Sequence, residues 1–128
     1  MPTKEAFDYL EAFEINGEHT EFVVQKFTNK TLVIVSQFKK IGNFYAVKNQ
    51  VFSDPSMLAS RSTQIFDIIQ KFGASSIDIE GAIRYLMNFI DCSQEVLFSL
   101  SLKNPEEIDK DTMDKIKDVL IQIPVLTK

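Results

Sequence analysis

The chain has 128 residues, of which 45% are hydrophobic and 25% charged, and its net charge is −4 at pH 7. This length and composition predict one globular domain over residues 1–128. The acidic balance argues against nucleic acid as the main partner, because phosphate binding needs a basic surface. No apolar run is long enough to cross a bilayer as a helix, so we expect no membrane insertion.

The start of the chain and its cysteine content favour an intracellular protein. Residues 1–5 show no apolar signal region. The single cysteine, Cys92, cannot form an internal disulfide, which suits a reducing compartment. We therefore expect the protein in the cytoplasm or the nucleus.

The first predicted elements form a hairpin. Residues 7–15 place apolar side chains mostly on odd positions, which predicts a half-buried strand. Asn16 and Gly17 follow, and this pair readily forms the tight turn of a hairpin. Residues 20–27 should pair back antiparallel. A helix over residues 2–13 fits less well, because a second strand-like run follows the turn.

Residues 31–47 are the stretch around which the chain is organised. A β-branched apolar run is followed by a basic turn over residues 37–42 and by a second apolar segment over residues 43–47. This pattern predicts a second hairpin. Because residues 32–35 are all apolar, we expect them to be buried on both faces of a sheet. Four strands joined by short turns predict an antiparallel meander.

The next segments are irregular and then ambiguous. Residues 48–61 are polar and contain a turn signal at Asp54, and loops of this length tend to be functional. Residues 62–72 fit either a helix or a strand, and periodicity alone slightly favours the helix. The apolar side chains in question are Ile65, Ile68, Ile69 and Phe72.

Two helices and one further strand complete the chain. The first helix is expected from a cap at Ser75 or Ser76 to about residue 91. Residues 95–102 alternate and predict a strand with one buried face. The second helix should begin at Asn104 or nearer Asp111 and stop before Pro124. The apolar stripes are Ile79, Ala82, Ile83, Leu86, Met87 and Ile90, and then Met113, Ile116, Leu120 and Ile123.

These elements predict an α+β fold: a single domain with an antiparallel meander β-sheet of about six strands and two main helices packed on it. No group of residues suggests an enzyme. His19 lies next to a turn, and Cys92 follows a predicted helix end, where the helix dipole disfavours a thiolate. Asp109, Asp111 and Asp114 lack the glycine and the final glutamate of a calcium loop. We expect no catalysis, no cofactor and no metal.

The segment Thr-Leu-Val-Ile-Val-Ser-Gln-Phe-Lys-Lys-Ile-Gly at residues 31–42 resembles the third proteasome assembly chaperone family. In that family an apolar strand ends in a Thr/Ser-Gln-Phe triplet, followed by a basic turn and a glycine. The matching residues are Ser36, Gln37, Phe38, Lys40 and Gly42. The order of elements is similar across nearly the whole chain, whereas the N-terminal arm and the residues around 104–111 depart from the pattern.

The resemblance implies a non-catalytic protein that helps assemble the α-ring of the 20S proteasome by binding an α-subunit. It implies a dimer, formed with itself or with a related fourth assembly chaperone, and a strand over residues 62–70. It indicates neither which α-subunit is bound nor which type of dimer forms.

Two segments are candidates for partner binding. The tip of the second predicted hairpin is either an ordinary solvated turn or a basic contact for an acidic patch on a partner protein. The irregular loop that follows is the other plausible contact region. The candidate residues are Gln37, Phe38, Lys39 and Lys40 at the tip and Asp54 and Arg61 in the loop.

Two other functions fit the same pattern. A longin- or profilin-like scaffold would bind a small GTPase or a cytoskeletal protein, and it would share the sheet and the flanking helices. A small-molecule carrier or enzyme could use a pocket lined by some of the 11 phenylalanines.

Overall fold

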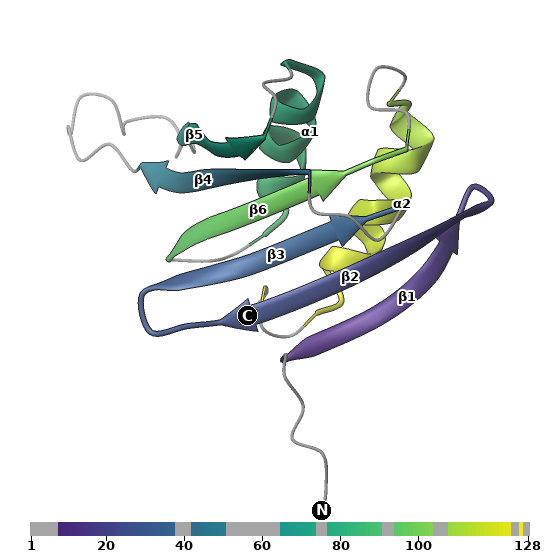
Figure 1. The fold of residues 1–128 in the computed structure, drawn as a ribbon, viewed down its shortest axis with the longest axis horizontal. Coiled ribbons are helices and arrows are strands. Elements are labelled where there is room, and N and C mark those ends of the chain that lie inside the picture. Colours follow the sequence, from purple (N-terminus) through teal and green to yellow (C-terminus); the bar gives the residue numbers. More distant parts are fainter. Residues whose placement is uncertain are drawn as a thin grey trace, which may run out of the picture.

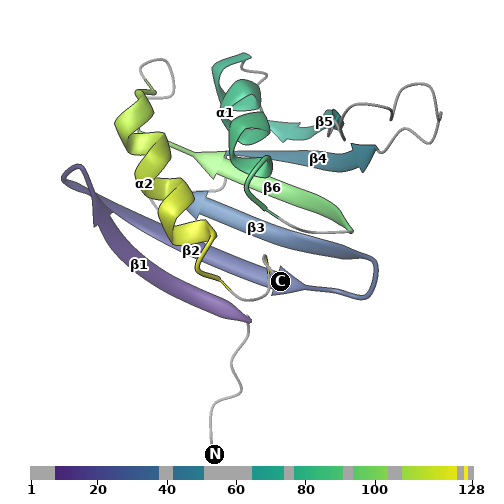
Figure 2. The same ribbon diagram turned by 180° about the vertical axis from the view of Figure 1, so that it is seen from behind.

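The computed structural model describes residues 8–37, 42–50, 65–73, 77–90, 94–103, 108–123 and 126. Its strands are β1 (Tyr9–Ile15), β2 (Glu18–Lys26), β3 (Lys30–Ser36), β4 (Asn43–Gln50), β5 (Ile65–Gly73) and β6 (Glu95–Ser101), and its helices are α1 (Ile77–Met87) and α2 (Lys110–Leu120). The strands form one sheet, and both helices pack on the same face of it (Figures 1 and 2).

The sheet is mixed, with the strand order β1-β2-β3-β6-β4-β5. Strand β6 runs parallel to β3 and antiparallel to β4, and the other neighbours are antiparallel. The predicted α+β fold, with its sheet of six strands and its two helices, is confirmed. The purely antiparallel meander is wrong in its detail, because β6 lies between β3 and β4 and runs parallel to β3.

The predicted hairpin over residues 31–47 does not form, because β6 lies between β3 and β4. In this central position the side chains of Val96, Phe98 and Leu100 are fully buried. Such burial is favourable by about 1.5–3 kcal/mol for each side chain. The entropic cost of closing a longer loop grows by only about 0.6 kcal/mol for each doubling of its length. Burial of β6 therefore outweighs the local hairpin.

The core lies between the sheet and the two helices. Val24, Val33, Phe98 and Tyr45 are in register on adjacent strands and are at most 1% exposed. Both helices place the predicted stripes against this row. Helix α2 begins nearer the later of its two predicted starts, because the Asp109 side chain accepts a hydrogen bond from the backbone N–H of Thr112 at 2.9 Å.

The prediction that residues 32–35 are buried on both faces is wrong. Val33 and Val35 point toward the helices and are fully buried, whereas Leu32 and Ile34 point the other way and are half-buried. The difference arises because the described helices cover only one face of the sheet (Figure 2).

Strand β5 resolves the ambiguity at residues 62–72 in favour of the strand that the family resemblance implies. Its register against β4 shifts between Phe44 and Tyr45, which marks a bulge or a similar irregularity. Ile68 packs against the core, whereas Ile69 is 48% exposed. An irregular edge strand of this kind does not show the strict alternation by which a strand is predicted from sequence.

The end of β5 approaches the backbone of the residue that precedes β4. Gly73 has a φ of +94°, and a Cβ added there would meet the carbonyl oxygen of Gly42 and lie 2.9 Å from the Cα of Asn43. A side chain at this position would therefore be strained both by its backbone angle and by backbone atoms that cannot rotate away.

We predict that Gly73→Ala lowers the free energy of unfolding by about 2–4 kcal/mol. The matched control is Gly81→Ala in the exposed middle of α1, where an added Cβ has nothing within 4 Å. That change should raise stability by about 0.5–1 kcal/mol, because alanine loses less backbone entropy in a helix. Urea denaturation of both variants measures the two effects. If both variants changed the free energy of unfolding by a similar amount and in the same direction, the close approach at Gly73 would be contradicted.

Candidate functional site

The structure describes one of the six predicted partner-binding residues. Gln37 lies at the end of β3 and is half-buried. Phe38, Lys39 and Lys40 at the expected tip lie outside the described residues. The same holds for the two candidates in the irregular loop, which are Asp54 and Arg61. Contacts of these five residues stay predictions.

Gln37 forms hydrogen bonds with three residues from two other segments of the protein. Its backbone N–H donates to the carbonyl oxygen of Ser101 at 2.9 Å. Its side-chain oxygen accepts from the backbone N–H of Lys103 at 3.0 Å, and its side-chain nitrogen donates to the hydroxyl of Thr20 at 3.3 Å. These bonds hold the end of β3 to the end of β6, so the structure assigns Gln37 a structural role.

Gly42 and Asn43 form the matching contact on the other side of β6. The amide of Asn43 is buried and bonds to both backbone groups of Leu100, donating to its carbonyl oxygen at 2.8 Å and accepting from its N–H at 3.0 Å. The backbone N–H of Gly42 donates to the hydroxyl of Ser101 at 2.9 Å. Gln37 and Asn43 thus fix both ends of the connection between β3 and β4 against the end of β6.

The face of the sheet opposite the helices carries apolar side chains across its middle. In register, Leu10 of β1 is followed by Val23 of β2 and Ile34 of β3. A second row contains Leu32, Leu97, Ala46 and Ile69 on β3, β6, β4 and β5. We call these seven residues the open face. A sheet face in contact with water is usually polar, so an apolar row of this length indicates an interaction surface.

The open face is neither uniformly covered nor uniformly exposed. Val23, Leu32, Ile34 and Leu97 are half-buried at its centre. At the two edges of the sheet, Leu10 and Ile69 are 60% and 48% exposed.

Charged side chains flank the open face at one end of the strands. Glu14 and Glu21 lie on the same side of the sheet, on β1 and β2 next to the first turn. His19 lies between them, with its Nε2 atom 3.3 Å from a carboxylate oxygen of Glu21. At the opposite edge, β5 carries Lys71, which is exposed and lies where the register against β4 shifts. The open face is therefore flanked by acidic side chains near β1 and β2, and an exposed lysine lies on the edge strand β5 at the other side of the sheet.

A polar network on the helix side links α1 to α2. The hydroxyl of Tyr85 donates to Asp114 at 2.7 Å, and the ammonium of Lys110 donates to the other carboxylate oxygen at 3.0 Å. The hydrogen bond from Tyr85 and then that from Lys110 lower the pKa of Asp114, and the same bond raises the pKa of Tyr85. We interpret this network as structural, because the bond from Tyr85 joins α1 to α2 and the Lys110–Asp114 ion pair lies within α2.

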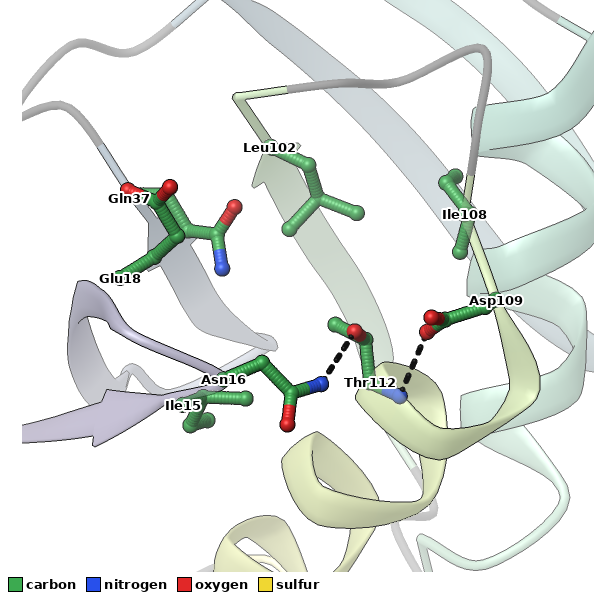
Figure 3. Close-up of a pocket in the computed structure, with 8 residues that line it drawn as sticks. All are labelled: Ile15, Asn16, Glu18, Gln37, Leu102, Ile108, Asp109 and Thr112. Carbon is green, nitrogen blue, oxygen red and sulfur yellow. Dashed lines mark hydrogen bonds between the residues drawn. The ribbon is translucent and has the colours of Figure 1, made fainter.

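A pocket of about 260 Å³ opens where the turn between β1 and β2, the end of β6 and the start of α2 meet (Figure 3). Its residues are Ile15, Asn16, Glu18, Gln37, Leu102, Ile108, Asp109 and Thr112. The side-chain nitrogen of Asn16 donates to the hydroxyl of Thr112 at 2.7 Å. Hydrogen bonds from the side chain and the backbone of Thr112 lower the pKa of Asp109, so this carboxylate stays ionised.

Two classes of site have no support in the described part of the chain. It contains no group of three or more His, Cys, Asp or Glu side chains that could hold a metal ion. Neither of its helices is long and apolar enough to cross a membrane.

Sequence reasoning missed both the open face and the pocket. The open face had a signal in the sequence. Apolar residues occupy both the odd and the even positions of β3, and in β6 the apolar Leu97 shares its face with two serines. We interpreted the first of these patterns as burial on two faces. The pocket had no signal, since its lining comes from four separate parts of the sequence: residues 15–18, Gln37, Leu102 and residues 108–112.

Comparison with known proteins identifies the family. The family model described as proteasome assembly chaperone 3 matches residues 33–123. A chain of a solved chaperone complex for yeast 20S proteasome assembly has a similar fold, with a TM-score of 0.69 and 11% identity over 91% of this chain and 96% of that one. Comparison with curated proteins gave no match. Because the family model spans well over half of its residues, the chain belongs to the proteasome assembly chaperone 3 family.

Proposed function

We propose that the protein is a non-catalytic assembly chaperone of the 20S proteasome that acts as a dimer and binds an α-ring subunit in the cytoplasm or the nucleus. Membership of the proteasome assembly chaperone 3 family supports the proteasome as its target. The observation that carries the dimer is the apolar open face, which the described helices leave uncovered (Figures 1 and 2).

A second sheet is the occupant that best suits the open face. The face is broad and follows the pleat of all six strands, so another pleated sheet could pack on it as the two sheets of a sandwich do. Leu10 and Ile69 extend the apolar area to both edges. Covering this half-buried apolar surface would remove the rest of it from water, and each Å² buried in this way contributes about 25 cal/mol of favourable free energy.

The charges of the open face suit pairing with a second copy of the chain. A two-fold axis parallel to the strands would place β1 and β2 of one copy opposite β5 of the other. Glu14 and Glu21 of each copy would then approach Lys71 of its partner. These ion pairs would lie at the rim, where they favour one orientation and add little affinity.

The contact with the α-subunit is proposed on different residues. Gln37 and Asn43, which flank the segment that carries Lys39 and Lys40, are both held at the end of β6. Phe38, Asp54 and Arg61 complete the candidate set taken from the sequence. We propose that both surfaces can be occupied at the same time.

We predict that the isolated chain is a dimer and that Ile34→Glu separates it into monomers. A buried, unpaired carboxylate at the centre of the open face costs several kcal/mol, so the dissociation constant should rise by about 100-fold or more. Light scattering during size-exclusion chromatography measures the mass. The control is Ile77→Glu, which adds the same charge at the 87% exposed first residue of α1 and should leave the dimer intact.

The charges allow a sharper form of the same test. Lys71→Glu should weaken the dimer about tenfold at low salt, and Glu21→Lys in the same chain should restore it by re-forming the pair with reversed signs. A wild-type monomer would overturn pairing of the chain with itself. A dimer insensitive to Ile34→Glu would overturn the open face as its interface.

We also predict that the immobilised chain retains one of the individual 20S α-subunits, alone or together with a related fourth assembly chaperone. Lys39→Glu combined with Lys40→Glu should weaken this binding about tenfold by removing attraction to an acidic patch. The control is Lys26→Glu, which reverses the charge of an exposed lysine at the end of β2 that pairs with the start of β3, on the other end of the sheet from Gln37. Retention of none of the α-subunits under either condition would refute this function, and retention of a small GTPase or actin instead would favour a longin- or profilin-like scaffold.

A further inference from the structure

The pocket at the start of α2 is separate from the open face. Its walls come from the turn between β1 and β2, from the end of β6 and from the residues before α2, all on the helix side or at the end of the sheet (Figure 3). At about 260 Å³ it is smaller than typical small-molecule sites, which measure about 300–1,000 Å³. It is much larger than the roughly 30 Å³ that one water molecule occupies. The volume suits a single long side chain.

The pocket has more hydrogen-bond acceptors than donors. The side-chain nitrogens of Asn16 and Gln37 already donate to protein hydroxyl groups, at 2.7 Å and 3.3 Å. Glu18 and Asp109 each bring a carboxylate that can accept about four hydrogen bonds. Asp109 uses part of this capacity to cap α2. A molecule that enters the pocket must therefore supply donors.

The charge of the pocket also favours a ligand that supplies hydrogen-bond donors, and in particular a cation. Among the described residues, Glu18 forms an ion pair with Lys103, whose Nζ atom lies 3.3 Å from its carboxylate, and Lys115 is the cation that acts on Asp109. The side chain of Lys103 is 57% exposed, so water screens this ion pair and another cation can compete for Glu18. The second carboxylate, on Asp109, lies on the other side of the opening (Figure 3).

We propose that this pocket binds an arginine side chain of a protein partner. The apolar stem of the arginine would lie against Leu102 and Ile108, and its guanidinium would donate to Glu18 and Asp109. A planar group with five donors can reach two carboxylates at once, which a compact ammonium does less well. The two carboxylates disfavour a phosphate or another anion. This binding site does not depend on the partner being a proteasome subunit.

The test uses the full-length, ¹⁵N-labelled chain and three small probes. Nα-acetyl-arginine amide should cause saturable shifts in the backbone amide signals of Asn16, Glu18, Asp109 and Thr112. Nα-acetyl-citrulline amide has nearly the same shape without the charge, and it should bind at least tenfold more weakly. Nα-acetyl-lysine amide should bind more weakly than the arginine probe.

Variants distinguish binding in the pocket from general attraction to an acidic protein. Glu18→Gln and Asp109→Asn should each weaken the arginine probe about tenfold. Asparagine also caps helices well, so Asp109→Asn should leave α2 intact. Asp111→Asn is the control, because it removes the same charge from the first turn of α2 at a residue that does not line the pocket.

Each outcome bears on the proposal. Shifts confined to the pocket, lost in the two pocket variants and kept in Asp111→Asn, would establish it. Equal binding of arginine and citrulline probes would overturn the role of charge, and equal binding of lysine would overturn the selection of a guanidinium. Shifts spread over the surface, or unaffected by Glu18→Gln, would overturn the site itself. None of these results depends on binding to an α-subunit.

Discussion

Strand β6 forms hydrogen bonds with β3 on one side and with β4 on the other, and this double pairing joins the two halves of the sheet. Without it, the antiparallel β1, β2 and β3 would form one unit and the β4–β5 pair another. The buried row from Val24 through Val33 and Phe98 to Tyr45 would also be broken at its centre. The core beneath both helices therefore depends on a strand that comes late in the chain.

Contacts with the end of β6 explain why Gln37, in the segment that resembles the family motif, and the nearby Asn43 both carry an amide. Gln37 needs an amide, because its side chain accepts from the backbone of Lys103 and donates to Thr20. Asn43 likewise donates to and accepts from Leu100. A carboxylate or an ammonium at either position could make only one of the two bonds. The glutamine that the motif has at position 37 is therefore a residue that the fold itself requires.

Local chemistry made much of the fold predictable from the sequence. Asn16 and Gly17 adopt positive φ angles of 52° and 83°, as the hairpin turn requires, and their strands pair as expected. Both helices follow from their apolar stripes. The separation of β3 from β4 was not predictable in this way, because a basic turn closed by a glycine is compatible with a tight hairpin and with a crossover around a third strand. That choice is made by residues 95–101, which lie far away in the sequence.

The candidate site was less predictable for a related reason. Alternation indicates which side chains share a face, but it does not show whether helices cover one face of a sheet or both. Leu32 and Ile34 therefore gave the same signal whether they were core residues or part of the open face. The pocket at α2 is harder still, since Glu18 and Asp109 come together only after the sheet and the second helix have packed.

The one-sided arrangement of the helices separates the proposed surfaces in space. A second sheet on the open face would lie on the side away from α2, whereas the pocket opens at the start of α2, where the β1–β2 turn reaches the helix layer (Figures 2 and 3). Asn16 links the turn to α2 through Thr112 and Lys115, so the pocket wall is held by contacts within one chain. A dimer formed through the open face would consequently keep both of its pockets accessible and present them on opposite outer sides.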